Sequence, residues 1–279
     1  MQKAELTAHR GEYDMTYRIN KKITKNILTD LCNTQYISDN LEFSFDEVDS
    51  PYSGIHYNDF AFKSAAGRLR TNETVDEILD LLKSEGIVDM NADFSRVIFR
   101  KILHKIQYNF IVPWISFTPV MERLVYMLTS LKKPENILAV GISSGYTLAF
   151  LAFACGKETK IFSVEKDAIL VNVAKDNFKR VGNIQNVEIA CMDGIEYIRQ
   201  FKDNNFDLIY LDTRKNIDIL LTCHKKLQKD GWMLQHNASD GHLSHFMKPY
   251  LDFVRDASNY KKSILFDVDT CGLELSIKH

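Results

Sequence analysis

The sequence predicts an α/β fold: an open, mostly parallel sheet in the second half of the chain, preceded by a mainly helical segment. Residues 137–147 (ILAVGISSGYT) read as a buried strand, a glycine turn and the start of a helix. Residues 161–166 read as a second strand that ends with an acid, Glu165, 20 positions after Gly145. A strand, a turn, a helix and a second strand in this order form the unit from which parallel sheets are built.

Three further segments complete the predicted sheet. Residues 206–212 (FDLIYLD) read as a buried strand that ends at Asp212. Residues 263–268 and 273–277 read as a hairpin whose strands have alternating faces, joined by the turn at residues 269–272. A terminal antiparallel hairpin argues against a purely parallel dinucleotide-binding domain.

The first half of the chain reads mainly as helices. Residues 15–32 have helical spacing with basic side chains on one side, and residues 72–83 and 94–108 are amphipathic. We therefore predict a helical cap or lid over residues 1–112 and a catalytic domain over residues 113–279.

The junction between these regions contains aromatic residues and a capped helix. Thr118 is the expected N-cap of a helix over residues 118–131, with proline at its first helical position. Tyr108, Trp114 and Phe117 precede this helix, and we expect them to be buried between the cap and the sheet.

The strand ends predict a nucleoside cofactor without phosphates. Gly141 and Gly145 allow the backbone to approach a ligand closely, and Glu165 is placed to accept hydrogen bonds from ribose hydroxyls. The turn lacks the G-x-G-x-x-G spacing of dinucleotide sites, and no G-x-x-x-x-G-K-[ST] loop occurs in the sequence.

The assembled pattern resembles the class I S-adenosylmethionine-dependent methyltransferases over residues 115–279. It is most similar to the branch that contains catechol O-methyltransferase and caffeoyl-coenzyme A O-methyltransferase. The resemblance implies a Rossmann-like sheet and S-adenosyl-L-methionine as cofactor. It also implies these cofactor-binding positions: Gly141, Ser143, Gly145 and Tyr146 at the turn, Glu165 and Lys166 at the ribose and adenine, Asp193 and Gly194 at the adenine, and Asp212 at the floor of the reaction site.

Two positions depart from the family pattern at the cofactor turn. The position two before the first glycine, which is normally acidic, is Ala139, and the middle glycine is replaced by Ser143. An acid in place of Ala139 would help to hold the ammonium group of the cofactor. We therefore expect the amino-acid end of the cofactor to be held differently.

A third departure concerns the catalytic residues, which we expect to be Asp212, His236 and Asn237. The cation-dependent enzymes of the branch have an Asp-Asn pair where this chain has His236-Asn237. Three roles for His236 stay open: a residue that only lines the pocket, a general base, or a ligand of a metal softer than magnesium. The general-base role rests on an unperturbed histidine pKa of about 6.5, which leaves a useful neutral fraction at pH 7. A divalent metal is therefore left open.

Two polar segments are candidates for contact with a substrate. Tyr52, His56 and Tyr57 belong to an aromatic segment that we expect to line a substrate pocket. The alternative is an irregular segment that its aromatic side chains anchor. The clustered Asp240, His242 and His245 fit no zinc spacing and are interpreted as a polar loop at the pocket mouth.

Bulk properties indicate a small-molecule enzyme. The net charge is −2, from 35 basic and 37 acidic residues, with no basic stripe, so we expect no nucleic-acid partner. The five cysteines are scattered, which is typical of a reducing compartment. There is no apolar signal core or membrane span, so we expect a cytoplasmic protein without a membrane partner. The N-terminal region is a possible homodimer surface.

Three functional hypotheses follow. The first is methyl transfer to the hydroxyl or amine of a small molecule. The second is transfer or cyclisation of the aminocarboxypropyl group of the same cofactor, with release of methylthioadenosine; the altered turn at Ala139 and Ser143 motivates it. The third is a non-catalytic binding or scaffold protein that keeps the methyltransferase fold.

Overall fold

The computed structural model describes residues 4–10, 13–19, 71–111, 118–182, 184, 186–213, 217–238, 244–269 and 271–279. The strands are β1 (Ala4–Arg10), β2 (Tyr13–Ile19), β3 (Asn136–Val140), β4 (Lys160–Glu165), β5 (Val187–Cys191), β6 (Phe206–Leu211), β7 (Leu227–His236), β8 (Tyr260–Phe266) and β9 (Leu273–Lys278). The helices are α3 (Thr71–Ser84), α4 (Arg96–Asn109), α5 (Pro119–Lys132), α6 (Tyr146–Ala154), α7 (Ala168–Arg180), α8 (Gly194–Arg199), α9 (Ile217–Lys226) and α10 (Ser244–Arg255).

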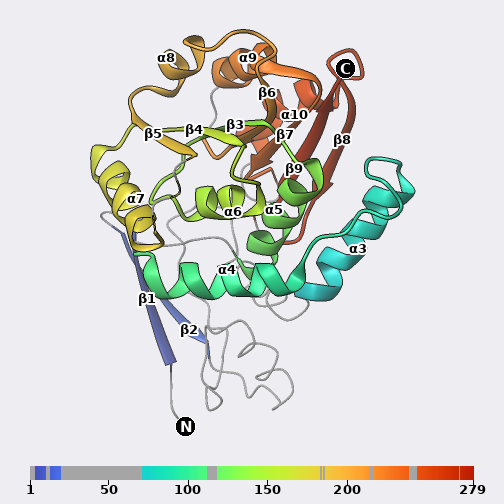
Figure 1. The fold of residues 1–279 in the computed structure, drawn as a ribbon. Helices are drawn as coiled ribbons and strands as arrows, with labels where there is room; N and C mark the ends of the chain where they lie inside the picture. Colours follow the sequence, from blue (N-terminus) through green and yellow to red (C-terminus); the bar gives the residue numbers. More distant parts are fainter. Residues whose placement is uncertain are drawn as a thin grey trace.

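Strands β3 to β9 form one sheet in the order β5-β4-β3-β6-β7-β9-β8 (Figure 1). The first five strands in this order are parallel, whereas β9 pairs antiparallel with both β7 and β8. The chain moves outward from β3 on one side through β4 and β5, and on the other side through β6 and β7. The predicted fold class is confirmed, and the switch point lies beside β3, where open α/β sheets bind their ligands.

Both faces of the sheet are buried because helices cover each of them. Successive side chains of a strand point to opposite faces and therefore pack against different helices. Ile137 and Ala139 of β3 pack with α5, α6 and α7, whereas Leu138 and Val140 pack with α8, α9 and α10. Figure 1 shows the two helical layers on either side of the sheet. Burial on both faces explains why β3 and β6 are continuous apolar runs in the sequence.

Helices α3 and α4 share the core of the catalytic sheet. Their apolar faces belong to the same buried cluster as α5 and α6. The ring of Phe99 in α4 lies 5.1 Å from Tyr126 in α5 and 6.1 Å from Phe150 in α6, measured between ring centroids. The division of the chain near residue 112 stays a prediction, and helices on its two sides bury apolar surface together.

Two expectations for the N-terminal half are wrong. The predicted helix from Met15 is contradicted by β2, which pairs antiparallel with β1 in a separate two-stranded sheet. The run YDMTYRI alternates apolar and polar residues and contains tyrosine, threonine and isoleucine, which favour strands. Tyr108 is 69% exposed rather than buried, because it lies on the outer face of α4. Trp114 and Phe117 lie outside the described residues.

The predicted C-terminal hairpin is confirmed as β8 and β9, but β9 does not alternate. Residues 273–277 are all buried, because β9 lies between β7 and β8 and both of its faces are covered. Glu274 in this strand is fully buried; it accepts hydrogen bonds from Arg255 Nε at 3.0 Å and Ser263 Oγ at 2.9 Å. Among the described helices, none is long and apolar enough to cross a membrane.

His224 in α9 predicts an acid-sensitive stability. Its ring lies 5.2 Å from the rings of both Phe253 and Tyr260, and burial, together with the positive charge of Lys278, lowers its pKa to about 4. The unfolded chain binds a proton near pH 6.5, so this contribution to stability is complete above that pH and is lost as pH falls towards 4. We expect a loss of about 1 kcal/mol, less than the full shift would give, because the ring is only half-buried.

Urea unfolding at pH 7.5 and pH 4.5 measures this effect. His224→Phe is expected to reduce the difference between the two pH values. His104→Phe, on the exposed face of α4, serves as the control and should leave the difference unchanged. An equal pH dependence in the wild type and in His224→Phe would show that other groups control the acid response.

Candidate functional site

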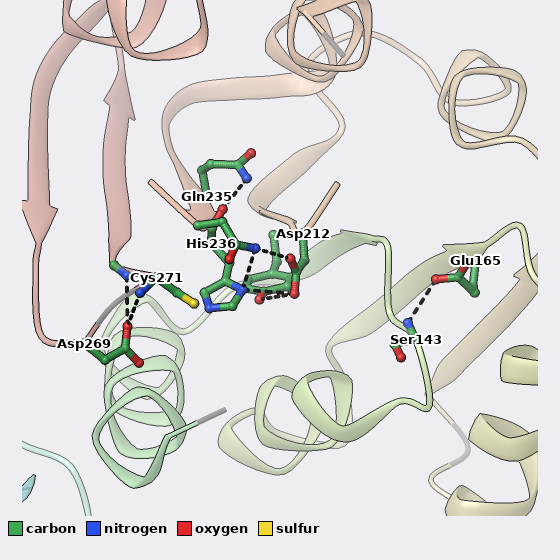
Figure 2. Close-up of polar contacts among 10 residues, drawn as sticks. Ser143, Glu165, Asp212, Gln235, His236, Asp269 and Cys271 are labelled. Carbon is green, nitrogen blue, oxygen red and sulfur yellow. Dashed lines mark hydrogen bonds and ion pairs between the residues drawn. The ribbon is translucent and has the colours of Figure 1, made fainter. Parts of the chain in front are cut away.

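The candidate site lies along one edge of the sheet, where five neighbouring strands place loop residues. Glu165 ends β4, the glycine turn at residues 141–145 follows β3, Asp212 follows β6, and His236 ends β7. Because β9 is antiparallel to β7, with Leu273 opposite His236, the start of β9 brings Cys271 to the same edge. Figure 2 shows this row from Glu165 through Asp212 to Cys271.

The two glycines of the turn are required by its close packing. Gly141 has φ +81°, and a Cβ there would lie 2.3 Å from the carbonyl oxygen of Asp212. Gly145, also at φ +81°, begins α6, and its Cβ would lie 3.1 Å from both Ala174 and Phe178 of α7. The turn therefore holds β6 and α7 close to the start of α6.

Glu165 is held by three backbone amides. One oxygen, Oε2, accepts a hydrogen bond from Ser143 N at 3.0 Å, and Oε1 accepts from Lys166 N at 2.9 Å and Asp167 N at 3.1 Å. Ser143 has φ +49°, which aims its amide at the carboxylate. An ionised carboxylate has about four acceptor positions, so Glu165 keeps capacity for a ribose hydroxyl. Lys166 is exposed beside it.

Asp193 and Gly194 lie at the start of α8. Asp193 is the exposed N-cap of this helix, and its Oδ1 accepts from Ile195 N at 2.9 Å and Glu196 N at 3.2 Å. Gly194 packs against β3, because a Cβ there would lie 3.2 Å from Cγ1 of Val140. The arrangement explains both residues structurally and leaves the second carboxylate oxygen of Asp193 for a ligand.

Two residues on either side of the turn, Ala139 and Tyr146, are buried in the core. The hydroxyl of Tyr146 donates to Oε1 of the fully buried Glu122 at 2.6 Å, so its side chain lies in the core and only its main chain remains at the turn. Ala139 is fully buried in β3 between Ser163 of β4 and Tyr210 of β6. No carboxylate at this strand position is available to hold an ammonium group.

Asp212, His236 and Asn237, which we predict to be catalytic, contact one another. Figure 2 shows the first two. The distance from Asp212 Oδ2 to His236 Nδ1 is 3.1 Å, and Asn237 Nδ2 donates to Asp212 Oδ1 at 2.9 Å. The side chain of His236 is 12% exposed and that of Asp212 is 28% exposed, so the pair lies at the bottom of the site. Tyr210 lies below, with its hydroxyl 3.5 Å from Asp212 Oδ2.

The ionisation of His236 differs from the sequence-based expectation. Burial of the imidazole lowers its pKa, but the negative charge of Asp212 and the hydrogen bond to Asp212 outweigh burial, and Cys271 adds to them. The net result is a pKa well above the ordinary value for histidine. The expectation of an unperturbed pKa for His236 is therefore wrong, because the contact with Asp212 favours the imidazolium form.

Cys271 and Asp269 belong to the site, and the sequence interpretation missed them. The sulfur of Cys271 lies beside the ring of His236, which stands between Cys271 and Asp212 in Figure 2, and its proximity contributes to the raised pKa of His236. Asp269, 3% exposed, holds the turn before β9: its Oδ1 accepts from Cys271 N and Gly272 N, both at 2.9 Å, and its Oδ2 accepts from Thr118 Oγ1 at 2.5 Å. The predicted hairpin contained the signal, since an antiparallel partner of β7 must begin beside His236.

The donor set does not fit a magnesium site. An imidazole replaces a carboxylate, and the amide nitrogen of Asn237 points at both Asp212 and His236 Nδ1. Among the described residues there is no group of three or more His, Cys, Asp or Glu side chains placed to hold a metal ion. The candidate substrate residues Tyr52, His56 and Tyr57, and also Asp240 and His242, lie outside the described residues, and the side chain of His245 is not described.

Asn177 in α7 joins the glycine turn to the segment after α4. Its Oδ1 accepts from Ile111 N at 2.7 Å, and its Nδ2 donates to Ile111 O at 2.8 Å and Ser144 O at 3.0 Å. The side chain is 1% exposed. We expect Asn177→Leu to lower the free energy of unfolding by about 3 kcal/mol, because it removes the side-chain partner of three backbone groups, one of them the buried Ser144 O. In the control Asn186→Leu, the amide lost is half-buried and donates to Thr159 O at 2.7 Å, so we expect about 1 kcal/mol. Urea unfolding measures both, and equal losses would contradict the role of Asn177.

Comparison with known protein families identifies proteins that are similar to this chain. Residues 51–222, more than half of the chain, match the model of the protein-L-isoaspartate(D-aspartate) O-methyltransferase (PCMT) family. The chain belongs to this family. Its resemblance to class I methyltransferases is thereby confirmed.

Two curated proteins are similar over part of the chain. A catechol O-methyltransferase from Niastella koreensis is 29% identical over 107 residues, which cover 37% of this chain and 48% of that protein. A polyamine aminopropyltransferase from Prochlorococcus marinus is 30% identical over 93 residues, or 31% of each chain. The chain thus spans about half or less of the length of these relatives.

Solved structures support the fold. The O-methyltransferase TomG from Streptomyces achromogenes, involved in tomaymycin synthesis and solved with SAM, has a TM-score of 0.54 and 16% identity. The similarity covers 72% of this chain and 96% of TomG. At this identity the likeness concerns the fold alone.

Proposed function

We propose that the protein transfers the methyl group of S-adenosyl-L-methionine to a hydroxyl or amine of a small molecule. The observation that carries this proposal is the order of groups along the sheet edge. The carboxylate of Glu165 and the glycine turn come first, and the Asp212–His236 pair follows beyond the switch point. A nucleoside cofactor and then an acceptor would lie along this edge in the same order.

The chain's own residues fit the cofactor at the turn. Glu165 would accept the ribose hydroxyls, Lys166 and Asp193 would lie at the adenine, and the main chain of residues 141–146 would border the methionine part. When bound, the cofactor supplies an electrophilic methyl group on a sulfonium sulfur. With Ala139 buried and Tyr146 bonded to Glu122, the amino-acid end of the cofactor must rely on the main chain of the turn.

On the acceptor side, His236 would remove the proton, with Asp212 and Asn237 fixing its ring. Because Asp212 raises the pKa of His236, the neutral imidazole increases only as pH rises through that raised value. The rate should therefore rise with pH above neutrality. His236→Ala should reduce kcat by about 100-fold and change cofactor affinity much less, as single-turnover kinetics and calorimetry would show. Unchanged turnover would exclude the base role.

A second acceptor class is favoured by the same charge. An imidazolium at the acceptor position suits a carboxylate, which needs no base, and the family's description names an aspartate derivative. With a carboxylate acceptor, the rate should fall rather than rise as pH passes through the pKa of His236. The direction of the pH dependence thus separates the two acceptor classes.

A second reaction is motivated by the altered turn. Ala139 and Ser143 leave the amino-acid end without its usual acid, and one partial relative is named as an aminopropyltransferase. Attack at the aminocarboxypropyl carbon would release methylthioadenosine instead of S-adenosylhomocysteine.

The experiment is incubation of the purified protein with S-adenosyl-L-methionine and a panel of hydroxyl, amine and carboxylate acceptors. The nucleoside by-product is identified by mass spectrometry against a no-enzyme control. S-adenosylhomocysteine would support methyl transfer, and methylthioadenosine would overturn it. Absence of cofactor binding in calorimetry would exclude both reactions and support the third hypothesis, a non-catalytic binding or scaffold protein.

A further inference from the structure

Cys271 lies in a chemical environment that the proposed reaction does not require. Its sulfur points at the ring of His236 in Figure 2, and Nδ1 of that ring lies 3.1 Å from Asp212 Oδ2. Cys271 is not in a disulfide and is partly exposed. A cysteine, a histidine and an aspartate in this order form the arrangement in which an oriented imidazole activates a thiol.

The position of Cys271 is fixed by the turn that carries it. Its backbone amide donates to the buried carboxylate of Asp269, which also binds Gly272 N and the hydroxyl of Thr118 at the start of α5. On the other side, Asn237 N donates to Gly272 O at 3.1 Å. The turn is therefore tied to both β7 and α5, and the thiol is held against the imidazole.

We propose that Cys271 is a site of reversible covalent modification by low-molecular-weight disulfides. The Cys271 sulfur would attack one sulfur of the disulfide, so that a mixed disulfide forms and the original S–S bond breaks. Cys271 is oxidised, the small disulfide is reduced, and the departing thiolate takes the proton that Cys271 loses. The charge on His236 stabilises the thiolate as it develops.

The charges around the pair support this chemistry. Asp212, directly after β6, lies 3.1 Å from His236 Nδ1, and the hydroxyl of Tyr210 in β6 lies 3.5 Å from Asp212 Oδ2. Asp269 accepts from the backbone amide of Cys271 in the turn before β9. Both oxygens of Asp269 accept hydrogen bonds, which offsets its repulsion of a thiolate. The imidazolium, held by Asp212, is the group in direct contact with the sulfur.

The other described cysteines provide internal comparisons. Cys191 is exposed at the end of β5, with its sulfur 4.0 Å from the carbonyl oxygen of Lys166. Burial raises the pKa of the Cys155 thiol to about 12 and also raises the pKa of the fully buried Cys223. Exposure alone would make Cys191 the most reactive of these, whereas the proposal assigns that place to Cys271.

Modification would also block the proposed methyl transfer, and this consequence rests on the proposed function. A group attached to Cys271 would lie beside His236 at the acceptor end of the row. Activity should then be lost in oxidised glutathione and restored by dithiothreitol. The labelling experiment needs neither cofactor nor acceptor, so its failure is distinguishable from failure of the proposed function.

The test is competitive labelling of the full chain with iodoacetamide across pH 5.5–9, read peptide by peptide by mass spectrometry. A parallel incubation with oxidised glutathione locates the mixed disulfide. We expect Cys271 to react about tenfold faster than Cys191 near pH 7 and to carry the glutathione. The His236→Phe variant should lose that excess while the rate at Cys191 stays the same.

Two controls keep the result decisive. Asp212→Asn retains the imidazole but removes its counter-charge, and it should slow Cys271 in the same direction by a smaller factor. Continued protection of Cys223 in each variant reports that the fold is intact. Equal rates at Cys271 and Cys191 in the wild type, or a fast Cys271 that ignores His236→Phe in the folded protein, would overturn the proposal.

Discussion

Replacing Gly141 by alanine is expected to lower the free energy of unfolding by about 4 kcal/mol and to abolish cofactor binding. The new Cβ would lie 2.3 Å from the carbonyl oxygen of Asp212, a distance that requires the backbone to move. Neither strand end can shift cheaply, because Asp212 N donates to Val140 O at 2.9 Å and Gly141 N donates to Val164 O at 3.0 Å. Overpacking of about 1–3 kcal/mol adds to about 1–2 kcal/mol for a left-handed non-glycine residue.

Gly182→Ala is the matched control for this substitution. Gly182 has φ +92°, close to the φ of Gly141, but a Cβ there would meet no atom of the described residues within 4 Å. Gly182→Ala should lower the free energy of unfolding by about 1 kcal/mol, the cost of a left-handed backbone alone, and should leave cofactor affinity unchanged. Urea unfolding and calorimetric titration with S-adenosyl-L-methionine measure both. Similar losses of stability in the two variants would show that the contact with Asp212 is not what restricts Gly141.

The parts of the fold that follow local patterns could be predicted from the sequence. Strand β3, the turn and the acid at Glu165 combine burial, glycine and spacing within a short segment, and each signal predicts the same structure. The helix at α5 was predicted from its proline and apolar spacing, although the hydroxyl of Thr118 binds Asp269 instead of capping the helix. That contact joins residues 151 positions apart, which no local pattern contains.

The errors have the same physical origin. The helical spacing of residues 15–32 competed with strand alternation in β2, and only pairing with β1 decides between them. Tyr108 is aromatic, as many core residues are, but it lies on the outer face of its helix. The pKa of His236 depends on its distance to Asp212 and on burial of its ring beside β9, the last strand of the chain. The presence of a histidine at position 236 therefore could not predict the shift in its pKa. Cys271 became a site residue for the same reason.

Asp212→Asn is expected to lower kcat by about 100-fold, the lower end of what general-base assistance contributes, and to move the ionisation of His236 towards its ordinary value. The carboxylate is the group that raises the pKa of His236, both by its charge and by the hydrogen bond to Nδ1. An amide has no charge and would offer Nδ1 a donor, which favours the neutral ring. The rate of hydroxyl or amine methylation would therefore reach its plateau at lower pH than in the wild type, at a lower level because the ring is less well oriented.

The same substitution has a consequence for stability whose sign is fixed by the direction of the shift. Because the folded pKa of His236 is raised, its contribution is complete below about pH 6.5 and is lost as pH rises through the raised value. Asp212→Asn should remove this dependence of stability on pH. NMR titration of the imidazole nitrogens would show the underlying change in the pKa of His236 without any assay of activity. In Asp207→Asn, at the opposite end of β6, the amide cannot accept on both sides as the carboxylate does, from Glu135 N at 3.0 Å and Asn136 N at 2.8 Å on one oxygen and from Gln228 Nε2 on the other. That control should destabilise the protein without moving the titration of His236. If the titration is unchanged in Asp212→Asn, Asp212 is not the group that charges the acceptor end of the site.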